Sequence, residues 1–385
     1  MIKNKAFKFR IYPNEKQETF LKQCMGCSRF VFNHFLSLNK ETYEKEHISL
    51  RYNDYANMLI DFKIEYPFLK DVDSISLQQS LRHLDTAFKN SFKYKNGLPQ
   101  YKKKSNHRDS YTTMNVNNNM AIIDDKHLKL PKLGIIKAKI HRNIPDDYKL
   151  KSATLSETPS GKYFVSLLYE YYEDEININI DENKILGLDY SMKELFVTDE
   201  KINVNNKYLR LYRKYEERLH FLQRALCRRI RPNYKKDIKA SKRYLKLRKQ
   251  IAKVLEHIKN MRLDYYNKLS KEITNLYDIV VVEDINMQEM ANMSKYNPKA
   301  TYDNGFGIFR KLLKTKMEER GKKYIVVDKY YASSKTCNVC GYKKDDLTID
   351  ERMWECPNCH TIHDRDINAS INLKKEGLRI YKGNK

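Results

Sequence analysis

The sequence predicts a multi-domain α+β protein, and three observations lead to this fold class. Short runs of alternating apolar and polar residues dominate residues 110–172, which is the period of β-strands. Residues 279–282 are apolar throughout, as expected for a strand that is buried on both faces of a parallel sheet. Four of the seven cysteines form two Cys-x-x-Cys pairs near the C-terminus. At 385 residues, the chain has the length for two or three domains.

The N-terminal half is predicted to be a β-barrel module that is interrupted by a helical lobe. Phe7, Phe9 and Ile11 alternate with polar residues, so residues 1–14 are expected to supply the first strand. Cys24 and Cys27 lie on the apolar stripe of the following helix and are interpreted as packing residues, not metal ligands. The predicted ranges are 15–95 for the helical lobe and 96–178 for the remaining strands.

The C-terminal half is predicted to be an α/β domain over residues 179–336. Its strands are expected at 185–188, 195–197, 279–282 and 324–327, and apolar residues at three- and four-residue steps predict a helical hairpin within 206–270. A cysteine-rich segment at 337–360, a last helix at 361–378 and a tail at 379–385 follow. The start of that helix at Asp366 has N-cap chemistry, and Ile367, Ile371 and Leu373 are predicted to face a core.

The composition indicates a polyanionic partner. Lys and Arg total 74 against 49 acidic residues, so the formal net charge is +25 at pH 7. In addition, 29 Tyr and 15 Phe supply rings on which nucleic-acid bases can stack. The sequence has no uncharged apolar stretch of about 18 residues and no long amphipathic helix with a basic face. A nucleic-acid-binding protein of the cytoplasm is expected, without a membrane partner.

Two segments are the predicted nucleic-acid contacts. Residues 93–104 interleave aromatic residues with cations in a loop broken by Gly and Pro, and the hairpin tip near 228–236 contains almost only positive charge. The predicted contact residues are Lys93, Tyr94, Lys95, Tyr101, Lys102, Lys103, Lys104, Arg228, Arg229, Arg231, Lys235 and Lys236.

The cysteine spacing predicts a structural zinc site. Two Cys-x-x-Cys pairs separated by fifteen residues, Cys337 with Cys340 and Cys356 with Cys359, are typical of two knuckles that complete one tetrahedral shell. A redox pair would need only one such motif. Because four thiolates fill the shell, neither His360 nor His363 is expected to be a ligand.

Three acidic residues are candidate ligands for a catalytic metal. Asp189 follows strand 185–188, Glu283 follows strand 279–282, and Asp366 opens the last helix. Each acid alone fits a cap or a surface residue. Carboxylates at adjacent strand ends and at a helix start can nevertheless converge on one spot, where their repulsion requires cations. Together they predict a magnesium or manganese site, such as the two-metal sites that cleave phosphodiester bonds.

The residues around these acids also resemble a known family. Its three RuvC motifs are matched by Gly187-Leu188-Asp189-Tyr190-Ser191, Val282-Glu283-Asp284-Ile285 and Arg365-Asp366-Ile367-Asn368-Ala369. The chain resembles the TnpB (OrfB) family, which consists of insertion-sequence-encoded RNA-guided DNA endonucleases related to type V CRISPR effectors. Residues 8–13, 130–134, 158–163 and 334–337 look like that family too, so the resemblance covers nearly the whole chain. Tyr190, Ser191 and Ser370 depart from the commonest pattern without removing an acid.

The resemblance implies that the α/β domain is an RNase H-like (RuvC) nuclease domain with an inserted zinc ribbon. It implies that Asp189, Glu283 and Asp366 are the catalytic carboxylates. Asp364 is a rival for the third position, but the family's acid precedes the Ile-Asn-Ala triplet, which selects Asp366.

The implied function is an RNA-guided, magnesium-dependent endodeoxyribonuclease encoded by a transposable element. It would cut target DNA beside a short adjacent motif with a single RuvC site. The implied partners are a guide RNA from its own locus and double-stranded target DNA, in the prokaryotic cytosol or nucleoid. Two alternatives stay open: a nuclease-silent RNA-guided DNA-binding regulator, which is expected to have lost triad acids, and an accessory transposase-type DNA-binding protein.

Overall fold

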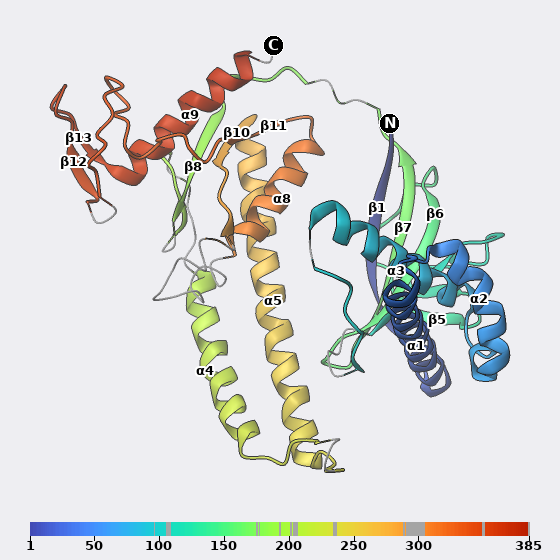
Figure 1. Ribbon diagram of the computed structural model, residues 1–385. Helices are drawn as coiled ribbons and strands as arrows, with labels where there is room; N and C mark the ends of the chain where they lie inside the picture. The colour runs from blue at the N-terminus through green and yellow to red at the C-terminus, as the bar shows by residue number, and fades with distance from the viewer. Residues whose placement is uncertain are drawn as a thin grey trace. The chain divides into compact units, whose positions relative to one another are not determined.

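The chain divides into two compact units (Figure 1). The computed structural model describes residues 1–383 except 96, 105–108, 175, 177, 192–193, 201, 203–206, 234–236, 288, 290–304, 349–350 and the side chains of 207–211. The first unit contains Met1–Asp174 and Ile230–Lys253, and the second contains Glu175–Arg229 and Val254–Lys385. The change of unit at Asp174 lies close to the predicted boundary at residue 178. In contrast, the tip of the predicted helical hairpin groups with the first unit.

β1 (Ile2–Tyr12) is the central strand of a seven-stranded antiparallel sheet in the first unit. Phe7, Phe9 and Ile11 are buried and alternate with exposed residues, so one face of β1 packs on the core. β1 pairs with β7 (Tyr163–Tyr172) on one side and with β5 (Gly134–Lys139) on the other. The N-terminal strand therefore joins the later strands, as the sequence predicted.

The hydrogen bonds of the described strands do not close this sheet into a barrel. The strand order is β2-β6-β7-β1-β5-β4-β3, and no pairing joins β2 to β3 within the described residues. The module that was predicted to be a barrel therefore forms an open sheet, with β2 and β3 as its two edge strands. The remaining strands are β2 (Ser110–Met114), β3 (Ala121–Ile122), β4 (His127–Leu130) and β6 (Lys149–Glu157).

A helical lobe follows β1 and packs on the same core. α1 (Glu15–Glu46) begins at a capping box, in which the Asn14 side chain accepts the Gln17 N–H and the Gln17 side chain accepts the Asn14 N–H. Cys24 and Cys27 are buried among apolar neighbours, which confirms that they are packing residues. The lobe continues with α2 (Tyr52–Glu65), a 3-10 turn (Pro67–Lys70) and α3 (Ser74–Tyr94).

The second unit is built on a sheet of strand order β11-β10-β8-β9. β8 (Ile185–Ser191) and β10 (Ile279–Glu283) are adjacent and parallel. β11 (Lys323–Val327) continues the sheet in parallel beside β10, and β9 (Leu195–Val197) pairs antiparallel with β8. All four strands lie where the apolar runs predicted them.

Successive residues of β8 and β10 face different helices. Even-numbered residues pack against α5 (Lys242–Leu276) and α8 (Phe306–Glu318), and odd-numbered residues pack against α9 (Arg365–Gly383). This alternation is the ordinary consequence of the two-residue period of a strand. The even-numbered set is Leu186, Leu188, Val280 and Val282, and the odd-numbered set is Ile185, Ile279 and Val281.

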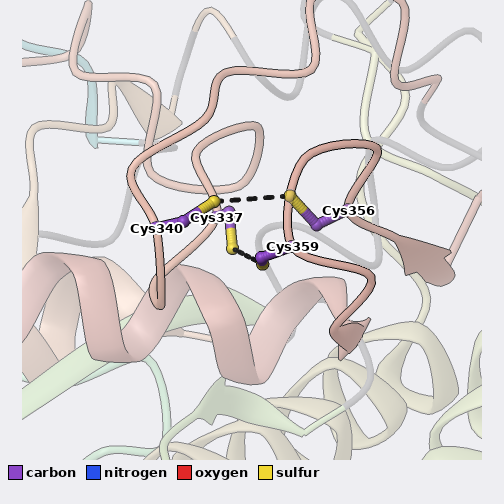
Figure 2. Close-up of side chains that lie close together, drawn as sticks. All are labelled: Cys337, Cys340, Cys356 and Cys359. Atoms are coloured by element: carbon purple, nitrogen blue, oxygen red, sulfur yellow. Dashed lines mark hydrogen bonds between the residues drawn. The ribbon is translucent and has the colours of Figure 1, made fainter.

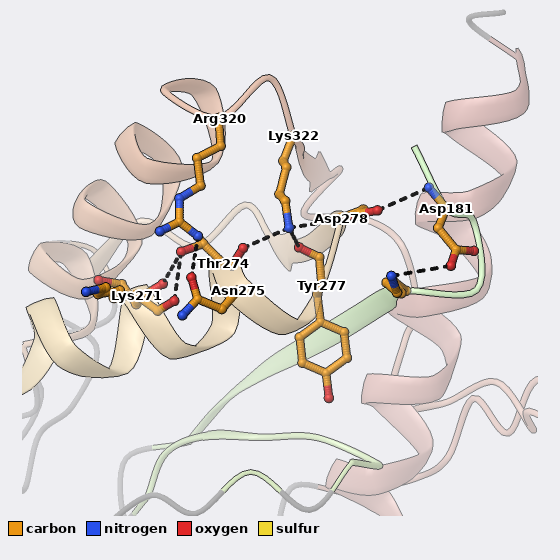
Figure 3. Close-up of polar contacts among 10 residues, drawn as sticks. Asp181, Lys271, Thr274, Asn275, Tyr277, Asp278, Arg320 and Lys322 are labelled. Atoms are coloured by element: carbon orange, nitrogen blue, oxygen red, sulfur yellow. Dashed lines mark hydrogen bonds and ion pairs between the residues drawn. The ribbon is translucent and has the colours of Figure 1, made fainter. Parts of the chain in front are cut away.

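A partly buried ion pair connects the starts of three strands (Figure 3). Just before β11, the ammonium of Lys322 lies 2.8 Å from the carboxylate of Asp278, which precedes β10. Lys322 also donates to the backbone carbonyls of Thr274 and Tyr277 at the end of α5, at 2.8 and 3.0 Å. The second carboxylate oxygen of Asp278 accepts the backbone N–H of Asp181, ahead of β8. A single carboxylate thus ties the starts of β8, β10 and β11 together.

Two predicted boundaries near the C-terminus are wrong. The cysteine-rich segment contains a two-stranded sheet of β12 (Met353–Glu355) and β13 (Ile362–Asp364), so it ends at residue 364 and not at 360. α9 then continues to Gly383, so residues 379–383 are helical where a tail was predicted.

The core-facing residues of α9 also differ from the prediction. Leu373 is buried against the sheet and Ile371 is half-buried, but Ile367 is 42% exposed. Ile367 lies about 120° around the helix from Leu373, because each residue advances the helix by about 100°. The side that faces the sheet therefore excludes Ile367.

Candidate active site and zinc site

Asp189 and Glu283 lie at the same level on neighbouring strands. In the register of β8 and β10, Val282 is opposite Leu188, so the next residues in each strand are Glu283 and Asp189. Both acids have odd numbers and thus continue the face that packs on α9. Both are half-buried. Two carboxylates therefore project from adjacent strand ends on the α9 side of the sheet.

Asp366 lies in the first turn of α9, on the side of the helix that meets the sheet. α9 approaches β8 so closely that a Cβ on Gly187 would lie 2.1 Å from the carbonyl oxygen of Ser370. Gly187 shares a strand face with Asp189, and Ser370 lies one helical turn after Asp366. This contact holds the beginning of α9 next to the carboxylate end of β8.

Asp364, and not Asp366, is the N-cap of α9. Its carboxylate accepts the backbone N–H groups of Asp366 and Ile367, each at 3.0 Å, and the helix begins at Arg365. The sequence interpretation that placed the cap at Asp366 is wrong by two residues, since a side chain caps the N–H groups two and three positions after it. The carboxylate of the rival acid Asp364 is thus engaged in capping the helix. The carboxylate of Asp366 does not cap the helix and lies 3.4 Å from the Arg365 guanidinium.

The three acids interact electrostatically. Burial, followed by the negative charges of Glu283 and Asp366, raises the pKa of Asp189 to about 8, and the charge of Arg365 opposes this shift. Burial also raises the pKa of Glu283, against the opposing charge of Arg310. Without a cation, Asp189 therefore retains its proton near neutral pH.

The donor set fits a divalent cation. Carboxylate oxygens are the ligands that magnesium and manganese prefer, and a cation would relieve the repulsion that raises the pKa of Asp189. Among the described residues, the group whose ligand atoms lie within 4.8 Å of one another consists of the four cysteines, and the three acids do not form such a group. Carboxylates that share a site repel one another when no cation is bound.

Two cations beside the acids were not among the residues predicted for the site. Arg310 donates to the backbone carbonyl of Ile285 at 3.2 Å, two residues after Glu283. Arg365 stands in the predicted motif, directly before Asp366. No sequence feature distinguishes Arg310 among the 74 basic residues.

The four cysteines meet in one cluster (Figure 2). The Sγ atoms of Cys337 and Cys359 are 3.6 Å apart, and so are those of Cys340 and Cys356. A disulfide would need about 2.05 Å. A tetrahedron with zinc–sulfur bonds of about 2.3 Å has edges of about 3.8 Å, close to the observed spacing. The cluster therefore fits a structural zinc ion.

Neither neighbouring histidine belongs to that cluster. His360 is exposed, and its Nδ1 lies 2.9 Å from the carboxylate of Glu355. His363 is buried against the ring of Trp354, and its Nε2 lies 3.1 Å from the Sγ of Cys337. His363 is thus placed to support a ligand thiol, as the outer partners of metal ligands do.

The predicted contact loop begins later than expected. Lys93 and Tyr94 are the last residues of α3, so the loop starts at Lys95. Tyr94 and Tyr101 are 58% and 43% exposed. The ammonium groups of Lys93 and Lys40 lie over these two rings, at 5.2 and 4.8 Å from their centroids. Lys95, Lys103 and Lys104 are exposed as well.

Lys102 differs from the other cations of the loop, because it is anchored on α1. Its ammonium lies 3.8 Å from the ring centroid of Phe32, and its backbone N–H and C=O bond to the side chain of Asn33 at 2.8 and 2.9 Å. Burial, with a smaller effect of Arg29, lowers the pKa of Lys102 to about 8. Lys102 therefore fixes the loop on the helix, although the residue is exposed like its neighbours in the loop.

The predicted contacts at the hairpin tip are described in part. Arg228, Arg229 and Arg231 are exposed after the end of α4 (Lys207–Cys227), as expected for contacts with phosphates. Lys235 and Lys236 lie outside the described residues.

Comparison with known proteins identifies the family. Residues 168–294 match the OrfB model described as a probable transposase, residues 306–373 match the Cas12f1-like TNB domain, and residues 1–47 match an OrfB model described as a helix-turn-helix domain. A "Putative RNA-guided DNA endonuclease" of Streptomyces pristinaespiralis is 30% identical over 379 residues, which covers 97% of this chain and 89% of the relative. This chain belongs to the TnpB (OrfB) family. The "Putative RNA-guided DNA endonuclease InsQ" of Escherichia coli (strain K12) is 26% identical over 397 residues, covering 99% and 94%.

A solved structure shares the fold of this TnpB-family chain. Cas12f1, in a complex with sgRNA and target DNA, aligns with a TM-score of 0.51 at 13% identity, over 97% of this chain and 99% of Cas12f1. Residues 1–47 form β1 and α1, although the matching model is described as helix-turn-helix. None of the described helices is long and apolar enough to cross a membrane.

Proposed function

We propose that this protein is an RNA-guided DNA endonuclease that hydrolyses phosphodiester bonds at a single RuvC-like site with magnesium or manganese. The observation that supports this function most is the placement of its acids. Asp189 and Glu283 lie at one level on adjacent parallel strands, and Asp366 lies on the helix that packs over them. The relatives in Streptomyces and Escherichia bear names of the same activity, which supports the assignment of substrate and guide.

The three carboxylates would hold the metal. When bound, magnesium or manganese supplies an activated water and stabilises the leaving oxygen. Asp189 must release its proton to become a ligand, and relief of its repulsion with Glu283 and Asp366 favours that release. Each acid projects from a strand or helix, and not from a loop, so its position is set before substrate binds. Arg365, beside Asp366, adds positive charge for a phosphate.

The proposed partners are a guide RNA from the protein's own locus and double-stranded DNA, in the prokaryotic cytosol or nucleoid. The net charge of +25 and the exposed cations and rings of residues 93–104 support two polyanions in one complex. In such an enzyme, base pairing with the guide selects the target, and the protein recognises only a short adjacent motif.

An accessory role in transposition is the second candidate, because the model that matches residues 168–294 is described as a probable transposase. The retained acids favour cleavage within that role. A nuclease-silent regulator is not favoured, because it would have no need to keep three mutually repelling carboxylates.

Substitution of the acids tests the nuclease. Asp189→Ala, Glu283→Ala and Asp366→Ala are each expected to abolish cleavage and to leave nucleic-acid binding nearly intact, because these acids bind metal and repel phosphates. Asp284→Ala is the matched control, since Asp284 directly follows Glu283 at the end of β10 and is exposed. Robust cutting by any triad variant in magnesium would reject the assignment.

Exchange of the guide tests the RNA dependence. When the gene is expressed together with its flanking DNA, the purified protein is expected to contain a structured RNA from that locus. Replacing the terminal segment of this RNA should redirect cutting to the matching target. The measurement is cleavage of a plasmid library by the complex with native or exchanged guides. Cutting that ignores the guide, or that survives removal of RNA, would leave only a general nuclease.

A further inference from the structure

α9 is buried on two opposite faces. The face on the side of Asp366 packs on the sheet, and the opposite face packs on the cysteine-rich segment. At about 100° per residue, the two stripes are separated by roughly half a turn of the helix. The stripe toward the sheet contains Ser370, Leu373 and Gly377, and the stripe toward the cysteines contains Asn368, Asn372 and Lys375.

Asn368 is bound into the first cysteine knuckle. Its side-chain amide donates to the carbonyl of Thr336 at 2.8 Å, and its side-chain oxygen accepts the backbone N–H of Asn338 at 3.0 Å. Thr336 and Asn338 are the residues on either side of Cys337. The amide of Asn368 thus joins both flanks of one proposed zinc ligand to the second turn of α9.

Asn372 repeats this contact one turn later. Its amide donates to the carbonyl of Thr336 at 2.6 Å and to the carbonyl of Ser333 at 2.8 Å. Lys375 donates from its ammonium to the carbonyl of Asn338. Three side chains of one helical stripe therefore bind the backbone of residues 333–338.

These contacts depend on asparagine chemistry. Asn368 and Asn372 are only 1% and 3% exposed, so their polar groups must be satisfied inside the protein. Asn368 donates to one backbone group and accepts from another, which an amide can do and an apolar or carboxylate side chain cannot. Burial of such a group would destabilise the fold without these bonds, so the bonds are specific contacts between α9 and the knuckle.

We propose that Asn368 and Asn372 are positioning residues that couple the four-cysteine zinc site to the carboxylate of Asp366. Zinc fixes the knuckle around Cys337, the two asparagines hold α9 to that knuckle, and α9 presents Asp366 to Asp189 and Glu283. The inference rests on the proposed nuclease function and adds to it that the zinc site governs how tightly the carboxylates bind magnesium. The outer partners of metal ligands typically change metal affinity by about 10- to 100-fold.

The magnesium dependence of cleavage is the first test. Asn368→Ala and Asn372→Ala are each expected to raise the magnesium concentration for half-maximal cutting by about 10-fold, with one zinc retained per chain. Cys337→Ser should also raise the magnesium concentration for half-maximal cutting. Adding Asn368→Ala to Cys337→Ser should raise that concentration little further, because the two substitutions act through one contact. The control is Arg379→Ala, which removes the ion pair between an exposed arginine and Glu376 on the same helix and leaves the contacts with the knuckle in place.

Two results of that test would overturn the coupling while the wild-type complex cuts. One is an unchanged magnesium requirement in both asparagine variants. The other is a lower maximal cleavage rate with an unchanged magnesium concentration for half-maximal cutting. That result would mean that the asparagines only help the protein to fold. A wild-type complex that does not cut would reject the proposed function instead, and the coupling is then decided by a measurement that needs no activity.

Hydrogen exchange of the full chain is that second measurement. Removal of zinc with a chelator is expected to speed exchange of the backbone amides of residues 366–370, and Asn368→Ala should exchange fast there even with zinc bound. Arg379→Ala should behave as the wild type. If α9 keeps the same protection after zinc is removed, the zinc site does not control the position of Asp366 and the proposal is wrong.

Discussion

Gly187→Ala changes the contact between β8 and α9 without replacing any of the three acids, and so tests how the candidate active site is positioned. A Cβ at this position would lie 2.1 Å from the Ser370 carbonyl oxygen and 3.0 Å from the backbone N of Lys374. Both atoms belong to the backbone of α9, so no side-chain rotation can make room. The strand or the helix must move.

The size of that movement follows from the contact distance. Real Cβ contacts essentially never fall under 3.0 Å, so α9 must retreat from β8 by about 0.9 Å, because a close-packed interior has no slack to absorb the overlap. Overpacking of this kind typically costs about 1 to 3 kcal/mol of folding free energy. Misplacement of a catalytic group by about 1 Å can cost about 100-fold in rate. Gly187→Ala is therefore expected to slow cutting by about 100-fold while the protein stays folded.

Single-turnover cleavage in magnesium, with thermal unfolding in parallel, measures both effects. The matched control is Gly377→Ala, where a Cβ would lie 2.2 Å from the side chain of Val281, eleven residues along α9 from Asp366. It should lower stability by a similar amount and slow cutting less, because it disturbs the far end of the helix. Cutting at the wild-type rate by Gly187→Ala, or equal losses of cutting in the two variants, would refute the idea that this contact positions Asp366.

Three further predictions concern metal, pH and the sheet. Cys337→Ser and Cys356→Ser should each lose bound zinc and destabilise the C-terminal half, because zinc binding is part of its folding free energy; metal analysis that finds one zinc per chain in both would contradict this. The pKa of Asp189 is raised from 3.8 to about 8 in the folded protein, so its protonated form stabilises the fold below about pH 4, and that stability is lost as the pH rises through about 8. In protein that is free of magnesium and manganese but keeps its zinc, Asp189→Asn should therefore raise the melting temperature more at about pH 9 than at about pH 5, and an equal change at both would exclude the shift. Lys322→Met should cost about 3 kcal/mol in urea unfolding, since it leaves the carboxylate of Asp278, only 13% exposed, without its cation; a change below about 1 kcal/mol would show that the pair is dispensable.

The sequence was sufficient for the strands of the second unit and for the position of its acids. The run 279–282 is apolar in every residue, as expected of a strand buried on both faces, and it lies between β8 and β11 in the sheet. Once β8 and β10 are known to be parallel, Asp189 and Glu283 follow as their next residues at equal level. These predictions depend on local periodicity, which a single sequence contains.

The errors arose where tertiary contacts decide. The sequence interpretation placed the cap at Asp366, and only the observed start of α9 assigns it to Asp364. The sequence also did not predict that the ammonium of Lys102 lies over the ring of Phe32, seventy residues earlier. Whether β2 and β3 pair depends on the curvature of the whole sheet, which no local pattern specifies.

The departures from the family's commonest pattern are explained by which side of the sheet each residue faces. Tyr190 has an even number, so it points away from α9, and its ring lies 4.9 Å from that of Phe306 on α8. A large residue is tolerated there, because it does not enter the space between the acids. Ser370 lies on the opposite side, where its backbone carbonyl meets Gly187 and the residue is fully buried. Its hydroxyl donates to the carbonyl of Ile367 at 2.8 Å within the helix, so the added polar group is satisfied without moving α9. Because Ser370 is fully buried, a larger side chain at this position should overpack the core between α9 and the sheet.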